Sequence, residues 1–490
     1  MAYSLRIPGT GLLLAVLLTA APLASRAQGT VTLVGKVSGK TADSVAVSIR
    51  ENLLDPKEQT TYAAVNDRGE FRLAVQVSGP TRADLVYDDD VADLFLEPGM
   101  ALEVKFKGND LAATVRYKGK GAEPNTFLAE MDERFTEVDG FQVLPENIMF
   151  YEAGFLHFLD YRRKEQRKFY ENTIDNEHYS AAFRDYINSE IDYSYANDRL
   201  TYQDLREQVV ATEGRLKMTP TYYDFLNDKA LINNPVALRS ELYQEFLLNY
   251  VHYMATSGGH QRTDPSFYQV CYDIAKSQLS GPTRPIIMGR VLQESFRFGH
   301  VKQSAAMLAD FRAADAKNEY FPVLQQDFET HKAFAIGAPA PNFHLTTASG
   351  DSVSLRSFAG KLVYINFWRT TSGLALRDLP YAADLIKRFD GKNIVFLNVA
   401  LDENEPAWKQ LVLGKKLPGV HVRAAGGMRS AIAKAYAIQD VPAYFLLAED
   451  GTFLNTKPKR LSSRAAVDEI KQSFGKAGTY SSTLPSSAGK

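Results

Sequence analysis

Cysteine is nearly absent from this sequence: Cys271 is the only one among 490 residues. A single cysteine excludes a disulfide framework within the chain and any intramolecular dithiol chemistry. An excess of one charge is also missing, because 56 basic residues face 58 acidic ones and the net charge is −2. Nucleic-acid binding needs a net basic surface, so this balance argues against it. The eight histidines are scattered without metal-ligand spacing, and we expect neither a metal nor a cofactor.

Long hydrophobic runs are missing after the first segment of the chain. Residues 1–27 are typical of a cleavable signal peptide, with Arg6, the apolar run Gly11–Leu23 and small residues before Ala27. A buried N-terminal helix is the alternative. No later run reaches 18 apolar residues, so we expect no membrane span in the mature chain. Export without a structural disulfide favours a bacterial periplasm or cell envelope, and the Ser- and Gly-rich residues 477–490 predict a disordered tail.

The length predicts about three domains, and the patterning predicts a multidomain α+β fold. Residues 29–120 carry short runs with period-two alternation, such as Ser44–Ile49 and Phe71–Val77, separated by turn signals, which indicates a β-sandwich. Residues 122–333 show helical periodicity and many aromatic residues. These aromatics are interpreted as helix-packing core, with an aromatic ligand groove as the alternative.

The single thiol falls inside the predicted helical domain. Phe267, Val270 and Ile274 surround Cys271 at helical spacing, which favours a buried and unreactive thiol. A reactive Cys271 remains possible only if the helical domain packs across a site elsewhere in the chain.

Residues 336–475 alternate strand and helix patterns. The apolar runs Leu362–Phe367, Ile394–Val399 and Tyr444–Leu447 predict strands, the first two buried on both faces. Helical patterns lie between them, over 378–389, 404–414 and 429–436. The order is a βαβ unit followed by a β-hairpin, which predicts an α/β domain.

In this region the sequence resembles the thioredoxin superfamily, and specifically its TlpA/ResA-like envelope branch. The pieces that carry the resemblance occur in order: Ile336–Phe343 (IGAPAPNF), Gly350–Leu355 (GDSVSL), Phe358–Lys361 (FAGK), Val363–Trp368 (VYINFW), Asn398–Asp402 (NVALD), Trp408, and Val441-Pro442 within Tyr436–Gly451. The segments NDRGEF and FLEPGM are similar to the β-domain that often precedes such domains. The resemblance implies a C-terminal thioredoxin-like fold and thiol-disulfide oxidoreductase ancestry.

The sequence departs from the family at the residues that do the chemistry. After its first central strand the family has W-x-x-x-C-x-x-C-x-x-E-x-P. This chain has Trp368, then Ser372 and Ala375 at the two cysteine positions, Asp378 at the acidic position and a proline at the last. A hydroxyl cannot replace the attacking thiolate and a methyl group cannot resolve a mixed disulfide.

The resemblance also implies where a binding cleft would lie. In the family, the proline at the position of Pro442 is cis and its loop presents backbone groups to an extended peptide. The candidate cleft residues are therefore Trp368, Ser372, Gly373, Asp378, Val441 and Pro442. The alternatives are structural: Ser372 or Thr371 caps a helix, and Pro442 is required only for folding.

Two classes of function follow from these features. The first is a periplasmic thioredoxin-like protein without redox activity that binds or scaffolds an envelope protein or an extended peptide, or that is purely structural. The second is an enzyme: a thiol-disulfide oxidoreductase of unrecognised mechanism, or a hydrolase with Ser372 as nucleophile and His344 or His421 as base. Whether the chain is an enzyme is therefore left open.

Overall fold

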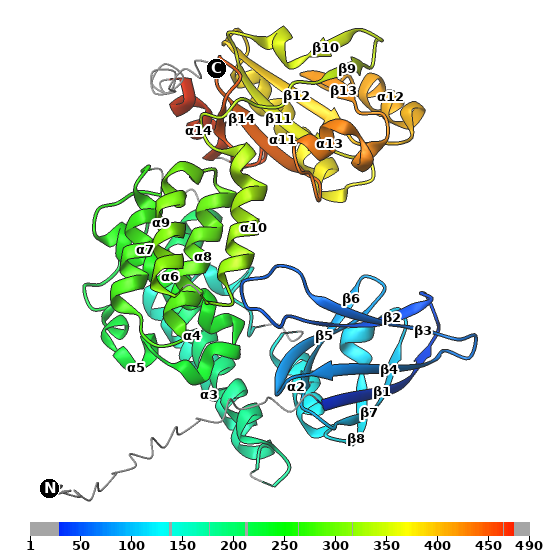
Figure 1. Ribbon diagram of the computed structural model, residues 1–490, viewed down its shortest axis with the longest axis vertical. Helices are drawn as coiled ribbons and strands as arrows, with labels where there is room; N and C mark the ends of the chain where they lie inside the picture. The colour runs from blue at the N-terminus through cyan, green and yellow to red at the C-terminus, as the bar shows by residue number, and fades with distance from the viewer. Residues whose placement is uncertain are drawn as a thin grey trace, which may run out of the picture. The chain divides into compact units, whose positions relative to one another are not determined.

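The computed structural model describes residues 29–474 except 137–139, 176, 211–213, 263, 316 and 464. The predicted signal peptide and C-terminal tail lie outside the described residues. The chain is mixed helix and sheet (Figure 1). It divides into two compact units, of which the first comprises the described parts of Met1–Ile49, Glu58–Phe141 and Lys168–Arg184, and the second the described parts of Arg50–Lys57, Gln142–Arg167 and Asp185–Lys490.

The first unit contains two four-stranded sheets that share one hydrophobic core. Their strand orders are β4-β1-β7-β8 and β3-β2-β5-β6. The bounds are β1 Gly29–Ser38, β2 Ser44–Ile49, β3 Gln59–Ala64, β4 Glu70–Val77, β5 Thr81–Tyr87, β6 Asp90–Leu96, β7 Ala101–Lys107, β8 Arg116–Lys120, α1 Leu111–Thr114 and α2 Glu123–Phe135. Burial alternates strictly along β4, because successive side chains point to opposite faces of a sheet and one face is solvated.

After α2, the regular elements of the described chain up to residue 334 are all helical. They are α3 Glu152–Thr173, α4 Ala181–Val209, α5 Lys229–Ile232, α6 Glu241–Ser257, α7 Phe267–Gln278, α8 Thr283–Arg297, α9 Val301–Ala314 and α10 Phe321–His331, with 3-10 turns at Asn147–Met149, Asp224–Asn227, Pro235–Arg239 and Lys332–Phe334. Phe246 and Tyr250 are buried, as expected for helix-packing core. Within the described ranges, no helix is both long enough and apolar enough to cross a membrane.

The short segment between β2 and β3 belongs to the second unit. Leu54 is buried in the helical core, and its carbonyl oxygen accepts a hydrogen bond from Nε2 of Gln293 at 2.7 Å. A Cβ on Gly289 would lie 2.1 Å from a methyl carbon of Leu54. A larger residue at position 289 would force the Leu54 side chain to move.

The rest of the second unit is a C-terminal domain with a seven-stranded sheet, drawn in yellow to red in Figure 1. The strand order is β10-β9-β13-β12-β11-β14-β15. Its elements are β9 His344–Thr347, β10 Ser352–Ser354, β11 Leu362–Trp368, α11 Gly373–Arg388, β12 Ile394–Ala400, α12 Glu405–Gly414, β13 Val420–Arg423, α13 Ala431–Ala435, β14 Ala443–Leu447, β15 Phe453–Asn455 and α14 Ala465–Phe474, with 3-10 turns at Leu355–Phe358 and Gly427–Arg429.

This sheet is covered by helices on both faces. Side chains of α11 and α14 pack with Tyr364 on one face, and side chains of α13 pack with Ile365 on the other. Every residue of β11 is buried, as the sequence predicts for a strand between two layers. The predicted strands are confirmed to within one residue, and β14 and β15 form the expected hairpin.

The predicted helix over 378–389 begins five residues earlier in the structure, at Gly373. Glycine is a poor helix former, so its presence hides the start from a pattern-based reading. The start is set instead by the capping residue before it.

Candidate functional site

The candidate site lies where β11 ends. Trp368 is the last residue of β11 and pairs with Ala400 at the end of the parallel strand β12. On the other side, Phe367 pairs with Ala443 at the start of the antiparallel strand β14. The segments 369–372, 401–404 and 440–442 therefore meet at one edge of the sheet, which we call the site edge.

Ser372 is the N-cap of α11. Its backbone is extended, with φ −81° and ψ 109°, and its Oγ accepts a hydrogen bond from the backbone N–H of Ala375 at 3.3 Å. This is the usual way in which a serine satisfies a free N–H at a helix start. The hydroxyl thus has a local structural task, and of the two expected capping residues the structure selects Ser372.

Ala375 and Trp368 lie inside the domain rather than on its surface. Both side chains are at most 5% exposed, and they share a small core with Ala400, Trp408 and Val412. The indole of Trp368 therefore supports the start of α11 from beneath. Its own surface is not available to a partner.

Asp378 is engaged by two residues from distant parts of the chain. Its Oδ2 accepts hydrogen bonds from Nη2 of Arg460 at 2.8 Å, from Nε of Arg460 at 3.1 Å and from the hydroxyl of Tyr444 at 3.1 Å. The hydrogen bond to Asp378 raises the pKa of the Arg460 guanidinium, and burial raises the pKa of the Tyr444 hydroxyl. The carboxylate therefore ties α11 to β14 and to the segment before α14.

Sequence reasoning missed Asp402 as a site residue. Its carboxylate accepts from the backbone N–H of Thr370 at 3.0 and 3.1 Å and from the Thr370 hydroxyl at 2.6 Å. Asp402 is 4% exposed, so these hydrogen bonds are shielded from water. The sequence did contain a signal for this pair. Thr370 and Asp402 each follow the end of a buried strand by two residues, and the two strands are parallel neighbours.

Of the candidate cleft residues, Gly373 is exposed and Ser372, Val441 and Pro442 are half-buried. Neighbouring residues are exposed as well, namely Thr371, Glu403, Asn404 and Asp440. The peptide bond between Val441 and Pro442 is cis. A Cβ built on Gly373 would have no described atom within 4 Å. The first turn of α11 is thus open to solvent at Gly373, and the structure brings this position and the 440–442 loop to the same edge.

The two histidines considered as a base for Ser372 make other contacts, and the His421 ring lies 6.3 Å from the indole ring of Trp368 between centroids. His421 is 7% exposed, its Nε2 lies 3.1 Å from the carbonyl oxygen of Pro418, and burial lowers its pKa. His344 lies on β9. Among the described residues, no histidine hydrogen-bonds to Ser372, and no group of three His, Cys, Asp or Glu could hold a metal ion.

Cys271 is fully buried on α7, as expected from the sequence. Burial raises the pKa of its thiol to about 12. The thiol is therefore protonated at neutral pH, and protonated thiols are poor nucleophiles.

We predict that a thiol reagent at pH 8 labels no cysteine in the folded protein and one after denaturation. The folded core excludes the reagent and keeps the Cys271 thiol protonated. Rapid labelling of the folded protein would contradict this assignment.

We predict that Asp402→Ala lowers the free energy of unfolding by about 1–3 kcal/mol, because it leaves the donors of Thr370 unpaired. Amide hydrogen exchange at Thr370 should accelerate. Asp402→Asn retains one oxygen and should have a smaller effect, and Asp384→Ala, at an exposed position of α11, serves as control. Unchanged exchange at Thr370 in Asp402→Ala would contradict the role given to Asp402.

Known proteins are similar to this chain in its C-terminal domain. The Redoxin family model matches residues 335–471. Thiol-disulfide oxidoreductase ResA of Bacillus cereus is 30% identical over 131 residues, which cover 27% of this chain and 74% of that protein. ResA of Bacillus subtilis is 27% identical over 124 residues, which cover 25% and 68%.

Solved structures give matches over the same share of the chain. A thiol-disulfide oxidoreductase from Bacteroides fragilis is 27% identical, with 27% of this chain and 98% of that chain covered and a TM-score of 0.24. A thiol:disulfide interchange protein from a Bacteroides species is 22% identical, with 30% and 95% covered and a TM-score of 0.27. Through its C-terminal domain, matched by the Redoxin model and by ResA, the chain belongs to the thioredoxin superfamily.

Proposed function

We propose that this chain is a TlpA-type protein of the periplasm or cell envelope that has lost dithiol chemistry and uses its site edge for binding. The occupant in this proposal is an extended polypeptide, either a peptide or a segment of an envelope protein. Residues 29–120 serve as a β-sandwich domain, 122–333 as a helical domain and 336–475 as the TlpA-like domain. Export by the predicted signal peptide 1–27 supplies the location.

The proposal rests on which side chains stand at positions 372 and 375 and on what those side chains contact. Ser372 uses its hydroxyl to cap α11, and the Ala375 methyl group is buried against Trp368. Thiol-disulfide exchange needs a thiolate that attacks and a second thiol that resolves the mixed disulfide. Neither position supplies sulfur.

The binding part of the proposal is supported by what the site edge exposes. The first turn of α11 is open at Gly373, and Val441 and Pro442 are half-buried. Farther along α11, Leu376 is 37% exposed and Tyr381 is 61% exposed. An extended chain has free backbone groups and alternating side chains, and it can use apolar contacts of this kind.

The enzymatic alternatives find less support. A redox route through Cys271 requires a buried, protonated thiol to reach another domain. A hydrolase requires a base near Ser372, whereas His421 is buried and its Nε2 faces Pro418. A purely structural role differs from the proposal only in lacking a specific occupant, and the binding experiment below separates the two.

We predict that the protein does not accelerate reduction of insulin disulfides by dithiothreitol, because it has no accessible thiol. Ser372→Cys/Ala375→Cys restores C-x-x-C at a helix start, with Cα atoms expected within the bridgeable range of about 4.4–6.8 Å. We expect a disulfide in oxidising buffer and measurable reductase activity. The helix N-terminus should also lower the pKa of the new thiol at position 372 below about 8.5.

The Ser372→Cys variant is the matched control, because it carries the same attacking thiol without a resolving one. It should form mixed disulfides and show much weaker turnover. Reductase activity of the unmodified protein that is lost in Cys271→Ser would contradict the proposal. Failure of the two new cysteines to bridge would contradict the alignment through Ser372 and Ala375.

We predict that reduced and carboxymethylated ribonuclease A, which is extended and has no thiols, binds the unmodified protein. Val441→Asp should weaken this binding by about tenfold, because it places a charge where apolar contact is expected. Fluorescence anisotropy of the labelled polypeptide measures the change. Leu413→Asp, at an exposed position of α12, is the control and should bind normally. Equal affinities for the two variants would exclude the site edge as the binding surface.

A further inference from the structure

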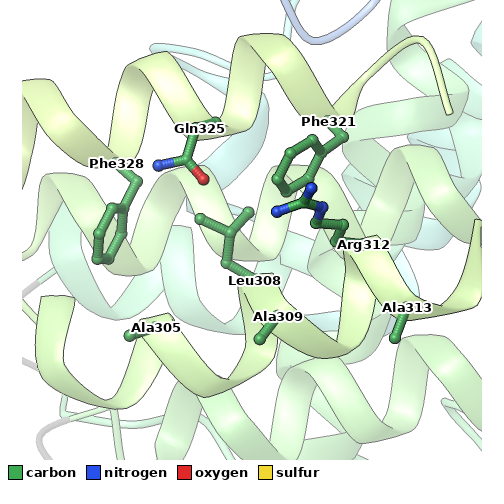
Figure 2. Close-up of a pocket in the computed structure, with 8 residues that line it drawn as sticks. All are labelled: Ala305, Leu308, Ala309, Arg312, Ala313, Phe321, Gln325 and Phe328. Atoms are coloured by element: carbon green, nitrogen blue, oxygen red, sulfur yellow. The ribbon is translucent and has the colours of Figure 1, made fainter. Parts of the chain in front are cut away.

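A groove lies between α9 and α10 in the helical part of the chain (Figure 2). Its volume is about 440 Å³, which falls within the range of small-molecule sites. It is independent of the site edge and has no part in the function proposed above. Its lining comprises Ala305, Leu308, Ala309, Arg312 and Ala313 of α9 and Phe321, Gln325 and Phe328 of α10.

The groove is lined mainly by apolar side chains, and the polar exceptions are Arg312 and the Gln325 amide, which lies on α10 between the two phenylalanines. Ala305, Ala309 and Ala313 recur every four residues, so their methyl groups follow one face of α9 and leave space above them. Phe321 and Phe328 form the wall on α10, and Figure 2 shows one ring at each end of the groove. The alanine row is about 12 Å long at 1.5 Å per residue, so it suits a narrow apolar body of that length.

One end of the groove is cationic. Arg312 is its only charged lining residue, and its guanidinium carbon lies 5.2 Å from the ring centroid of Phe321. In the part of the chain that the structure describes, Arg312 has no ion pair. The ring holds the planar guanidinium beside the groove, where it can donate two parallel hydrogen bonds to a carboxylate.

The opposite end favours an apolar group. Phe328 of α10 and Ala305 of α9 lie at that end (Figure 2). The neighbouring Glu329 accepts a hydrogen bond from Nε2 of Gln325 at 3.1 Å, and its carboxylate lies 3.5 Å from Nζ of Lys332. The acidic side chain is thus already paired. The groove therefore has a polarity, with a cation at the Phe321 end and hydrocarbon at the Phe328 end.

From this combination we propose that the groove between α9 and α10 binds an anionic amphiphile with a single narrow hydrocarbon chain. The carboxylate pairs with Arg312 and the chain lies along the alanine row toward Phe328. An extended chain of about ten carbons matches the length of the row. An uncharged or cationic amphiphile lacks the pairing with Arg312 and should bind less well.

The probes are decanoate, decanol and decyltrimethylammonium, titrated into the full-length protein by calorimetry. The two ionic probes stay below their micelle concentrations, and decanol stays below its solubility limit. We expect decanoate to bind about tenfold more tightly than decanol, as one charge-assisted pair would give. Arg312→Gln should make the two equal. Ala309→Phe should abolish decanoate binding by filling the middle of the groove.

Two control variants match the test variants: one adds a ring to α9 outside the groove, and the other removes an arginine elsewhere in the chain. Ala306→Phe adds the same ring on an exposed position of α9 outside the groove, and Arg388→Gln removes an exposed arginine from α11. Both should bind decanoate normally, and circular dichroism checks that every variant is folded. Absence of decanoate binding, equal loss in Ala306→Phe and Ala309→Phe, or unchanged preference for decanoate in Arg312→Gln would each overturn the proposal. So would tighter binding of decyltrimethylammonium.

Discussion

The C-terminal domain depends on the two-sided burial of β11. Leu362–Trp368 are all buried, with β12 parallel on one side and β14 antiparallel on the other. Parallel and antiparallel neighbours bring the end of β11, the end of β12 and the start of β14 to the same edge. The position of Ser372, Asp402 and Pro442 follows from this pairing alone. This arrangement of the three residues does not depend on thiol-disulfide exchange, the reaction after which the relatives are named.

Within this frame, polar contacts fix the details of the site edge. Asp402 holds Thr370 from the β12 side, and Asp378 holds Arg460 and Tyr444 from the α11 side. Both carboxylates are thereby engaged in structure. An edge whose segments are held by such contacts, and that is partly apolar and free of thiols, is suited to recognition, because a preformed surface loses little conformational freedom when it binds.

The sequence predicted the central strands well because β11 and β12 are short, continuous apolar-rich runs, a pattern typical of strands buried on both faces. It also placed Ser372 at a helix start. The pairing of Asp378 with Arg460 could not be predicted, because it joins residues 82 positions apart and only the fold brings them together. Trp368 was expected among the cleft residues, yet it lies in the core beneath α11, since the first turn of that helix covers it. The burial of Leu54 in the helical core could not be predicted for the same reason, because its neighbours there are far away in the sequence.

Amide hydrogen exchange of the full-length protein, with and without saturating reduced and carboxymethylated ribonuclease A, tests the central claim most directly. The claim is that the site edge binds an extended chain without exchanging thiols. The account predicts slower exchange in 369–376 and 438–443 on binding, with no covalent adduct by mass spectrometry and little change at the C-terminal end of helix α12. Unchanged exchange at both segments, or protection confined to other parts of the chain, would contradict it.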